Sequence, residues 1–359
     1  MVRLVGMGRT AHAAALPRRL VEAGLLALAA ALVWMGAQRP SILVVHSQSE
    51  RIPWTRGIDA GIDRAMQQAG AVRLERIYLQ GRDAQRTQAQ IAETLGFIGR
   101  WEPDVVMAVD DLAQARVGAA YLGARQPLIV YSGIEDHART LAHSQRPQVQ
   151  GIAERTPWPM VESSLLRLAP PGAARKPRIA LVSDTGPAAE EEARGFLAHG
   201  WQAAQPIGVW RCASLEQWLR ALDEIATQAD LVVIGDYRYL PVPAGRTAPS
   251  WRMQLTQAAL ERLPQPLSAL SGYAVMDGIP MGILPSPVEQ GEVATQLALQ
   301  AATAPEAFAA PAAARHLLTR NFALLVNPAQ MQRRHMRLDA LDTYYARISR
   351  RFIAPHAAP

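Results

Sequence analysis

Short apolar runs alternate with longer amphipathic stretches from residue 41 to about residue 268, and this alternation restricts the chain to few folds. Strands separated by helices of about 10–15 residues form parallel sheets with both faces covered. Right-handed crossovers place all strand-to-helix loops at one edge of each sheet. The expected strands are Ile42–His46, Arg73–Leu79, Val105–Val109, Leu128–Tyr131, Arg178–Val182, Ile207–Trp210 and Leu231–Gly235, and the expected helices lie near 55–70, 84–99, 112–124, 156–168, 188–199, 214–227 and 250–262.

The alternation is interrupted between residues 143 and 178, where proline, glycine and basic residues accumulate as they do at domain boundaries. We therefore predict an α/β protein with two Rossmann-like lobes of parallel strands. A glycine-rich stretch followed by a helix after residue 269 predicts a return to the first lobe. The expected division is 1–40 as signal peptide or N-terminal membrane anchor, 41–150 plus 270–305 as lobe 1, 151–269 plus 320–340 as lobe 2, and 341–359 as a C-terminal tail.

The N-terminal segment has the pattern of an export signal. Arg18 and Arg19 precede an apolar run from Ala23 to Ala37. A basic region followed by an apolar run of about 7–15 residues is typical of a secretory signal, whereas a spanning helix usually needs about 20 residues. Cleavage after Ala37 is imperfect because Met35 is larger than the cleavage rule prefers. We predict export to the periplasm, and an uncleaved anchor formed by residues 20–37 remains an alternative.

Charge and cysteine content exclude several classes of protein. The net charge of +6 is spread through 359 residues without a Lys/Arg-rich run, so the sequence predicts no nucleic-acid partner. Cys212 is the single cysteine, and no intramolecular disulfide can form. We expect Cys212 to fill the core rather than to react.

Polar residues follow the expected strands at the edge where the loops converge. They include Ser47 after the first strand, Asp110 and Asp111 after the third, and Ser132 and Gly133 after the fourth. Two lobes with such edges would enclose a cleft, where ligands of α/β sheets bind. Each of these residues has an alternative role, because Ser, Asp and Thr also cap the next helix by accepting free backbone N–H groups.

No catalytic or metal-binding motif appears in the sequence. There is no phosphate-binding P-loop, no G-x-G-x-x-G after the first strand and no G-x-S-x-G elbow. The histidines lack the spacing of metal ligands, and one cysteine is too few for most zinc sites. The sequence predicts no enzyme and no bound cofactor or metal, and a periplasmic α/β enzyme remains a further alternative.

Several segments resemble bacterial periplasmic substrate-binding proteins of the ABC-transporter type. "ILVVHSQSERIPWTRGIDAGI" (42–62) is similar to the opening of that family, and "PDVVMAVDDLA" (103–113) to a strand that ends in an Asp-Asp turn. Further similar segments are "PLIVYSGIED" (127–136), "GIAERTPWPMVESSLLRLAP" (151–170), "GILPSPVEQGEVATQLALQ" (282–300) and "NFALLVNPAQMQRR" (321–334).

The resemblance implies a type I periplasmic-binding-protein fold with two lobes, three hinge crossings and closure on a small solute. It implies delivery of that solute to an ABC permease, or signalling through a membrane sensor protein. The family carries its binding residues on the cleft loops. Matched onto this sequence, the ligand-binding residues are Ser47, Trp54, Asp110, Asp111, Ser132, Gly133, Glu154, Asp184, Asp236, Tyr237 and Asp277.

The chemistry of these residues suits a zwitterion such as an amino acid. Trp54 and Tyr237 could enclose a ring or a cation, since an aromatic face attracts both. Carboxylates of Asp110, Glu154 and Asp236 could hold an ammonium group, while Ser47, Ser132 and helix N-termini could hold a carboxylate. Trp54 has an alternative role as a hydrophobic staple at the start of its helix.

Overall fold

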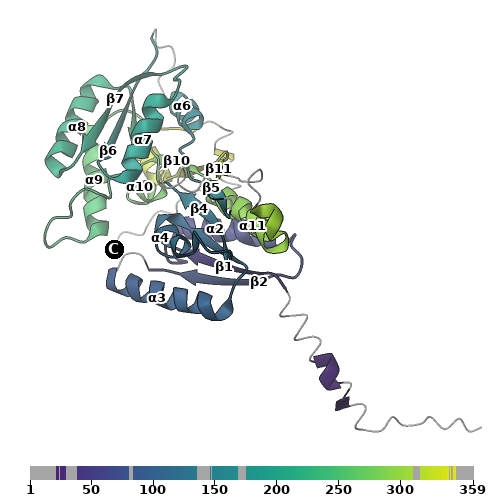
Figure 1. The fold of residues 1–359 in the computed structure, drawn as a ribbon. Coiled ribbons are helices and arrows are strands. Elements are labelled where there is room, and N and C mark those ends of the chain that lie inside the picture. The colour runs from purple at the N-terminus through teal and green to yellow at the C-terminus, as the bar shows by residue number, and fades with distance from the viewer. Residues whose placement is uncertain are drawn as a thin grey trace, which may run out of the picture.

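The computed structural model describes residues 22–23, 25–29, 39–80, 84–135, 146, 148–168, 175–309, 316–338, 340 and 343–344. These residues form two six-stranded sheets flanked by helices (Figure 1). The strand orders are β11-β5-β4-β3-β1-β2 and β12-β10-β9-β8-β6-β7. Strand pairs are parallel except that between β10 and β12, which is antiparallel. The predicted α/β class with parallel sheets in two lobes is confirmed.

The first sheet forms because its central strands are apolar on both faces. β1 is buried at every residue, with Ile42 and Val44 facing one helical layer and Leu43 and Val45 facing the other. The strands of this sheet are β1 (Ser41–His46), β2 (Arg73–Tyr78), β3 (Val105–Val109), β4 (Leu128–Ile134), β5 (Val149–Ala153) and β11 (His316–Leu318). Its helices are α2 (Pro53–Met66), α3 (Ala84–Trp101), α4 (Asp110–Arg116), η1 (Gly118–Tyr121), α11 (Pro287–Thr303) and α12 (Pro305–Phe308).

The second sheet repeats this plan and ends in a reversed edge strand. Its strands are β6 (Arg178–Asp184), β7 (Gln205–Cys212), β8 (Leu231–Ile234), β9 (Leu267–Ala269), β10 (Met281–Pro285) and β12 (Phe322–Val326). Its helices are α6 (Trp158–Leu166), α7 (Pro187–Ala198), α8 (Leu215–Gln228), α9 (Ala248–Arg262), α10 (Gly272–Met276) and α13 (Pro328–Arg333). Each of the seven expected strands overlaps a strand of the structure.

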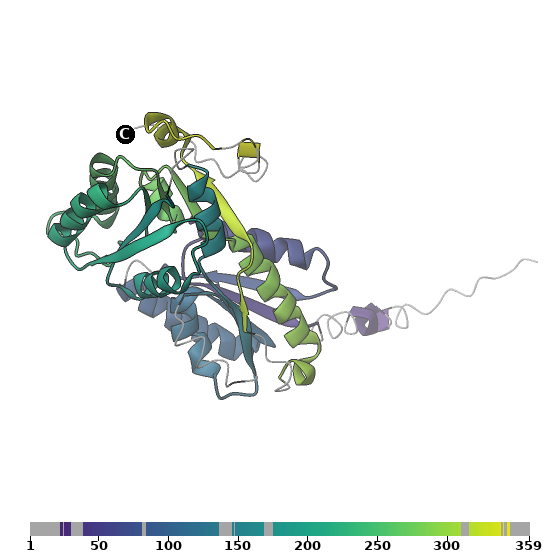
Figure 2. The same ribbon diagram turned by 90° about the horizontal axis from the view of Figure 1, so that it is seen from above.

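The chain passes between the sheets three times, as expected. β5 leads into α6, β10 leads into α11 through Ser286, and β11 leads into β12 through residues 319–321. In Figure 2, the long helix α11 and the yellow strand segment run beside each other between the two halves. The three connections therefore lie together at the junction of the two lobes.

The return to the first lobe occurs later in the chain than expected. The expected division places 270–305 in the first lobe, but β10 pairs with β9 and β12 in the second sheet, and only α11 packs against α2 of the first lobe. β10 spans only five residues and lies beside glycines, so its sequence resembled a connection rather than a strand. The expected bounds of the lobes otherwise stay a prediction.

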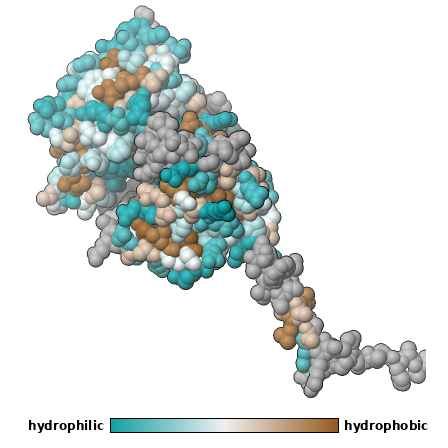
Figure 3. Space-filling view, viewed as in Figure 1, coloured by the Kyte–Doolittle hydropathy of each residue, from teal (hydrophilic) through white to brown (hydrophobic). Residues whose placement is uncertain are grey.

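The terminal predictions fall mainly outside the described residues. Of the expected export segment, residues 22–23 and 25–29 are described as helical, with Leu25, Leu26 and Leu28 exposed. Figure 3 shows brown and tan atoms, toward the hydrophobic end of its scale, on this short described stretch. None of the helices in the described residues has the length and apolar character to cross a membrane. Residues 345–359 of the predicted C-terminal tail lie outside the description.

Candidate functional site

The loops at the carboxyl ends of the two sheets lie within electrostatic range of one another. The charge of Arg238, after β8, acts to lower the pKa values of Asp110 and Glu154 in the first lobe, against the larger effect of their burial. Asp236, beside Arg238, acts in the opposite direction and raises the pKa of Glu135, after β4. We call these five residues, namely Asp110, Glu135, Glu154, Asp236 and Arg238, the interlobe site.

Trp54, Asp110 and Gly133 form the first-lobe side of this site. The indole Nε1 of Trp54 donates to the Oδ1 of Asp110 across 2.9 Å. Asp110 and Gly133 both have a positive φ, 66° and 68°, and a Cβ on Gly133 would lie 2.5 Å from that same Oδ1. A non-glycine residue such as Asp110 rarely adopts this backbone conformation, and the strain it stores is of a kind found at functional sites.

The first-lobe carboxyl groups are held in an environment that disfavours their charge. Burial raises the pKa of Asp110 to about 7, and repulsion from Glu135 and Asp111 adds to this despite the hydrogen bond from Trp54. Burial likewise raises the pKa of Glu135 to about 7 and that of Glu154 well above its usual range. Among the described residues, no group donates a hydrogen bond to the carboxyl group of Glu135 or Glu154, although the charge of Arg238 acts to lower both pKa values.

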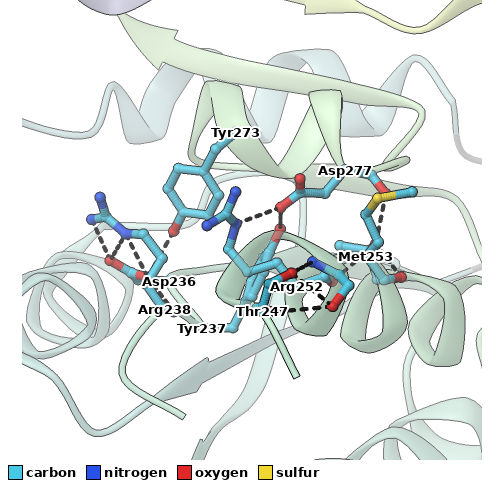
Figure 4. A network of polar contacts seen from close by, with 10 residues as sticks. Asp236, Tyr237, Arg238, Thr247, Arg252, Met253, Tyr273 and Asp277 are labelled. Carbon is cyan, nitrogen blue, oxygen red and sulfur yellow. Dashed lines mark hydrogen bonds and ion pairs between the residues drawn. The ribbon is translucent and has the colours of Figure 1, made fainter. Parts of the chain in front are cut away.

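The second-lobe side is already paired. Asp236 accepts hydrogen bonds from the Nε and Nη2 of Arg238, at 3.0 and 2.6 Å from Oδ2, and from the Tyr273 hydroxyl at 2.7 Å (Figure 4). The guanidinium of Arg238 lies over the Tyr273 ring, 4.6 Å from its centroid. Burial alone would raise the pKa of Asp236, but the charge and hydrogen bonds of Arg238 bring it below its usual value.

Tyr237 is placed differently from its expected role. Its ring is fully buried and lies 5.9 Å from the centroid of the Trp218 ring, in the core of the second lobe. Its hydroxyl donates to Asp277, which also accepts from the Nε of Arg252 (Figure 4). The Tyr237 ring also packs edge-on against the Tyr273 ring, with 5.4 Å between the ring centroids. Tyr273 provides the aromatic face beside Arg238.

The Ser47 hydroxyl and the Asp184 carboxylate form hydrogen bonds within their own lobes. The Oγ of Ser47 donates to the Val109 carbonyl and accepts from the Ala113 N–H, at 2.7 and 2.8 Å. The carboxylate of Asp184 accepts from the N–H groups of Gly186 and Tyr239, at 2.8 and 2.6 Å. Neither contact caps the helix that follows the strand, because α2 and α7 begin without a side-chain cap hydrogen bond. A role of Ser47 and Asp184 in ligand binding stays a prediction.

The structure brings Trp54, Asp110, Gly133, Glu154 and Asp236 to the facing loops and adds residues that the sequence reasoning did not select. Glu135 and Arg238 lie just after strand ends that the sequence identified, close to residues that it selected. Tyr273 and Glu192 come from helices distant in sequence. The Oε2 of Glu192 accepts from the Asp236 N–H at 2.7 Å, a tertiary contact with no local signal.

No group of three or more potential metal-ligating side chains occurs among the residues that the structure describes. Cys212 is buried in the core of the second lobe, and burial raises the pKa of its thiol to about 12. The thiol is therefore protonated at neutral pH and is a poor nucleophile.

Comparison with solved structures identifies the fold. The two hinged α/β lobes are those of type I periplasmic-binding proteins. An ABC domain in complex with L-Trp from Streptococcus pneumonia matches with a TM-score of 0.55 and 12% identity, over 85% of this chain and 98% of that one. A substrate-binding protein with adhesive properties from Clostridium difficile, in a ligand-free open form, matches with a TM-score of 0.60 and 12% identity, over 84% and 96%.

A third match is an extracellular ligand-binding receptor from Verminephrobacter eiseniae, with a TM-score of 0.50 and 12% identity over 80% of this chain and 97% of that one. No protein-family model matches the chain. A search of curated proteins also finds no match. The predicted resemblance is confirmed at the level of the fold, and the described neighbours are binding proteins rather than enzymes.

Proposed function

We propose that this protein binds a small solute with an ammonium group, such as an amino acid, between its lobes and delivers it to an ABC permease. The observation that carries the proposal is the unequal charge of the interlobe site, where carboxyl groups from both lobes share the guanidinium of Arg238. A cation brought between the lobes would relieve that imbalance. The solute leaves unaltered, since its binding and release require only opening and closing of the lobes.

The ammonium group of the solute would face the first lobe. Asp110, Glu135 and Glu154 lie there at raised pKa, and a positive charge among them favours their ionised form. Charge-assisted hydrogen bonds from an ammonium group to carboxylates are among the strong ones in proteins. The Trp54 ring adds an apolar wall beside Asp110.

The carboxylate of the solute would face Arg238. Its Nε and Nη2 bind Asp236, while the Nη1 makes no hydrogen bond to the described residues, and the side chain is 49% exposed. A guanidinium group binds carboxylates through parallel N–H donors. The Tyr273 ring holds the guanidinium plane from one side, so the free N–H groups have a fixed direction.

The test is a thermal-unfolding screen of the protein with the twenty amino acids, their decarboxylated amines and their deaminated acids. Ligand at a hundred times its Kd adds about 2.7 kcal/mol to the free energy of unfolding. We expect one amino-acid class to raise Tm, and its amine and deaminated analogues to raise it less. No stabilisation by any compound, together with turnover of a substrate, would contradict the proposal.

A matched pair of variants localises the ammonium site. Glu154→Gln should weaken binding of the amino acid and remove its advantage over the deaminated analogue. Glu216→Gln serves as the control, because Glu216 is an exposed residue of α8 in the second lobe. Equal losses in both variants would argue against a first-lobe ammonium site.

We also propose that the protein acts outside the cytoplasm. The basic and apolar N-terminal pattern and the likeness to an extracellular ligand-binding receptor support export. Release of the protein by osmotic shock would support a soluble carrier for a permease. Retention in washed membranes would instead support anchoring by residues 20–37 and signalling through a membrane partner.

A further inference from the structure

Gln290 is a fully buried polar side chain in the first turns of α11 that the proposed binding site does not use. Its Oε1 accepts from the backbone N–H of Gly133 at 2.8 Å and from the Ser132 hydroxyl at 3.3 Å. Its Nε2 donates to the Thr319 hydroxyl at 2.6 Å. One side-chain amide thus joins the carboxyl end of β4 to the end of β11.

Thr319 extends the connection to the end of β5. Its Oγ1 donates to the Ala153 carbonyl at 3.0 Å, and its backbone N–H approaches the same oxygen at 3.2 Å. Ala153 ends β5 at the first crossing, Gln290 lies just beyond the second crossing at Ser286, and Thr319 begins the third. The hydrogen-bond chain from Gln290 therefore contacts all three connections between the lobes.

A second contact ties two of these crossings together. The carboxylate of Glu289 accepts from the N–H groups of Arg320 and Asn321, at 3.0 and 2.7 Å, and the Ser286 N–H donates to the Asn321 carbonyl at 3.0 Å. These hydrogen bonds hold the second and third crossings side by side. They do not reach β4, whereas Gln290 also contacts the carboxyl end of that strand.

Gln290 contacts the carboxyl end of β4, which leads directly to residues of the interlobe site. Gly133 packs against the carboxylate of Asp110 and the ring of Trp54, and Glu135 follows two residues later. A shift of the end of β4 on binding a solute would move the Gly133 N–H relative to Gln290. Because an unpaired buried amide costs more than a broken surface contact, the crossings would adjust to keep the hydrogen bonds.

We propose that Gln290 is a positioning residue that couples the carboxyl end of β4, beside the interlobe site, to the three crossings, and so sets the angle between the lobes. This proposal rests on the proposed function in one respect, namely that solute binding would be the event that moves the end of β4. The side chain itself contacts no solute. It restricts the ligand-free protein to a narrow range of lobe orientations.

The test is a distance measurement between the lobes of the ligand-free protein by pulsed electron spin resonance. Spin labels at Ala92→Cys on α3 and Gln228→Cys on α8 report the distance, since both positions are exposed. Cys212 is buried with a protonated thiol and does not compete for the label. We expect Gln290→Met to broaden the distance distribution relative to the parent protein.

Control variants separate coupling from general stability. Thr295→Val removes a buried hydroxyl of the same helix, whose bond goes to the Gly291 carbonyl within α11, and should lower Tm without broadening the distribution. Thr319→Val should broaden it, and Thr319→Ser, which retains the hydroxyl, should not. Should Gln290→Met fail to fold, the two Thr319 variants still decide the question.

Unchanged distributions in Gln290→Met and Thr319→Val, or equal broadening in Thr295→Val, would overturn the proposal. Because the distances are measured without a solute, failure of the screen under "Proposed function" leaves this test intact. The reverse also holds, since a solute could bind to a protein whose lobe angle is independent of Gln290.

Discussion

The two sides of the interlobe site treat their carboxyl groups in opposite ways. On the first lobe, burial raises the pKa values of Asp110 and Glu135 to about 7. On the second lobe, Asp236 is as deeply placed but has a lowered pKa, because Arg238 and Tyr273 bind its carboxylate. The Asp236 carboxylate is paired within the protein, whereas a positive charge near the first-lobe carboxyl groups would favour their ionised form. The difference indicates which lobe would receive the cationic end of a solute.

The largest expected effect concerns the pH dependence of stability. The folded state keeps the Asp110 proton up to about pH 7, whereas the unfolded chain loses it near its ordinary pKa of 3.8. The free energy of unfolding should therefore fall as pH rises from about 4 to 7, by up to about 1.4 kcal/mol per pH unit for each such group. Asp110→Asn should flatten this slope in urea-unfolding measurements.

Asp236 gives the opposite sign and serves as the internal control. Its lowered pKa means that its contribution is present above pH 3.8 and is lost as pH falls further. Asp236→Asn should therefore alter the profile below pH 4 and reduce the slope between pH 4 and 7 less than Asp110→Asn does, since the Asp236 charge contributes only part of the raised pKa of Glu135. If the free energy of unfolding of Asp110→Asn fell with pH as steeply as that of the parent protein, the raised pKa of Asp110 would be contradicted, and with it the difference between the two lobes.

Removal of Arg238 should have the next largest effect. Arg238→Met leaves the Asp236 carboxylate without its cation, and we expect a loss of about 2 kcal/mol in the free energy of unfolding, limited by the partial exposure of the guanidinium. The control is Arg175→Met, because Arg175 forms a similar two-point pair with Asp230 at the surface. That variant should lose less stability than Arg238→Met, because an exposed ion pair is screened by solvent.

Gly133→Ala tests the packing of the first-lobe side. The new methyl group would meet the Asp110 carboxylate at 2.5 Å, on a backbone with φ of 68°. We expect a loss of about 1–3 kcal/mol in chemical denaturation. Gly123→Ala is the control, since no atom lies within 4 Å of its Cβ position, and should change stability by less than about 0.5 kcal/mol. Similar losses in both variants would contradict the described packing.

The smallest expected effect is the loss of a single indole hydrogen bond. Trp54→Phe removes the donor to Asp110 and should cost about 1 kcal/mol in the free energy of unfolding and raise the pKa of Asp110 further. Trp210→Phe removes a similar bond to Glu224 at the surface of the second lobe and should cost less. A larger loss in Trp210→Phe than in Trp54→Phe would contradict the expectation that the Trp54–Asp110 hydrogen bond contributes more to stability.

The sequence predicts the scaffold well because the scaffold depends on local patterns. Apolar runs such as Ile42–His46 are buried on both faces and therefore have a strong signal. β9 and β11, with three residues each, and β10, beside glycines, are held mainly by their neighbours in the sheet and have little signal of their own. The location of the loop residues Asp110 and Gly133 follows from the same strand pattern.

The pairing of the site residues could not be predicted in the same way. Ser47 and Asp110 occupy equivalent strand-end positions, yet the Ser47 hydroxyl bonds to Val109 and Ala113 while Asp110 contacts Trp54. Tyr273 reaches Asp236 from a helix 37 positions later in the chain. Such partners are decided by the packing of distant elements, which residue types and spacing do not encode.

Calorimetric titration in buffers of different ionisation enthalpy tests the central claim most directly. It would use the most stabilising compound of the thermal screen at pH 6.5 and count the protons exchanged on binding. An ammonium group placed among Asp110, Glu135 and Glu154 lowers their pKa values, so we expect the protein to release protons. Binding without proton release, or with proton uptake, would contradict a cation-binding first lobe.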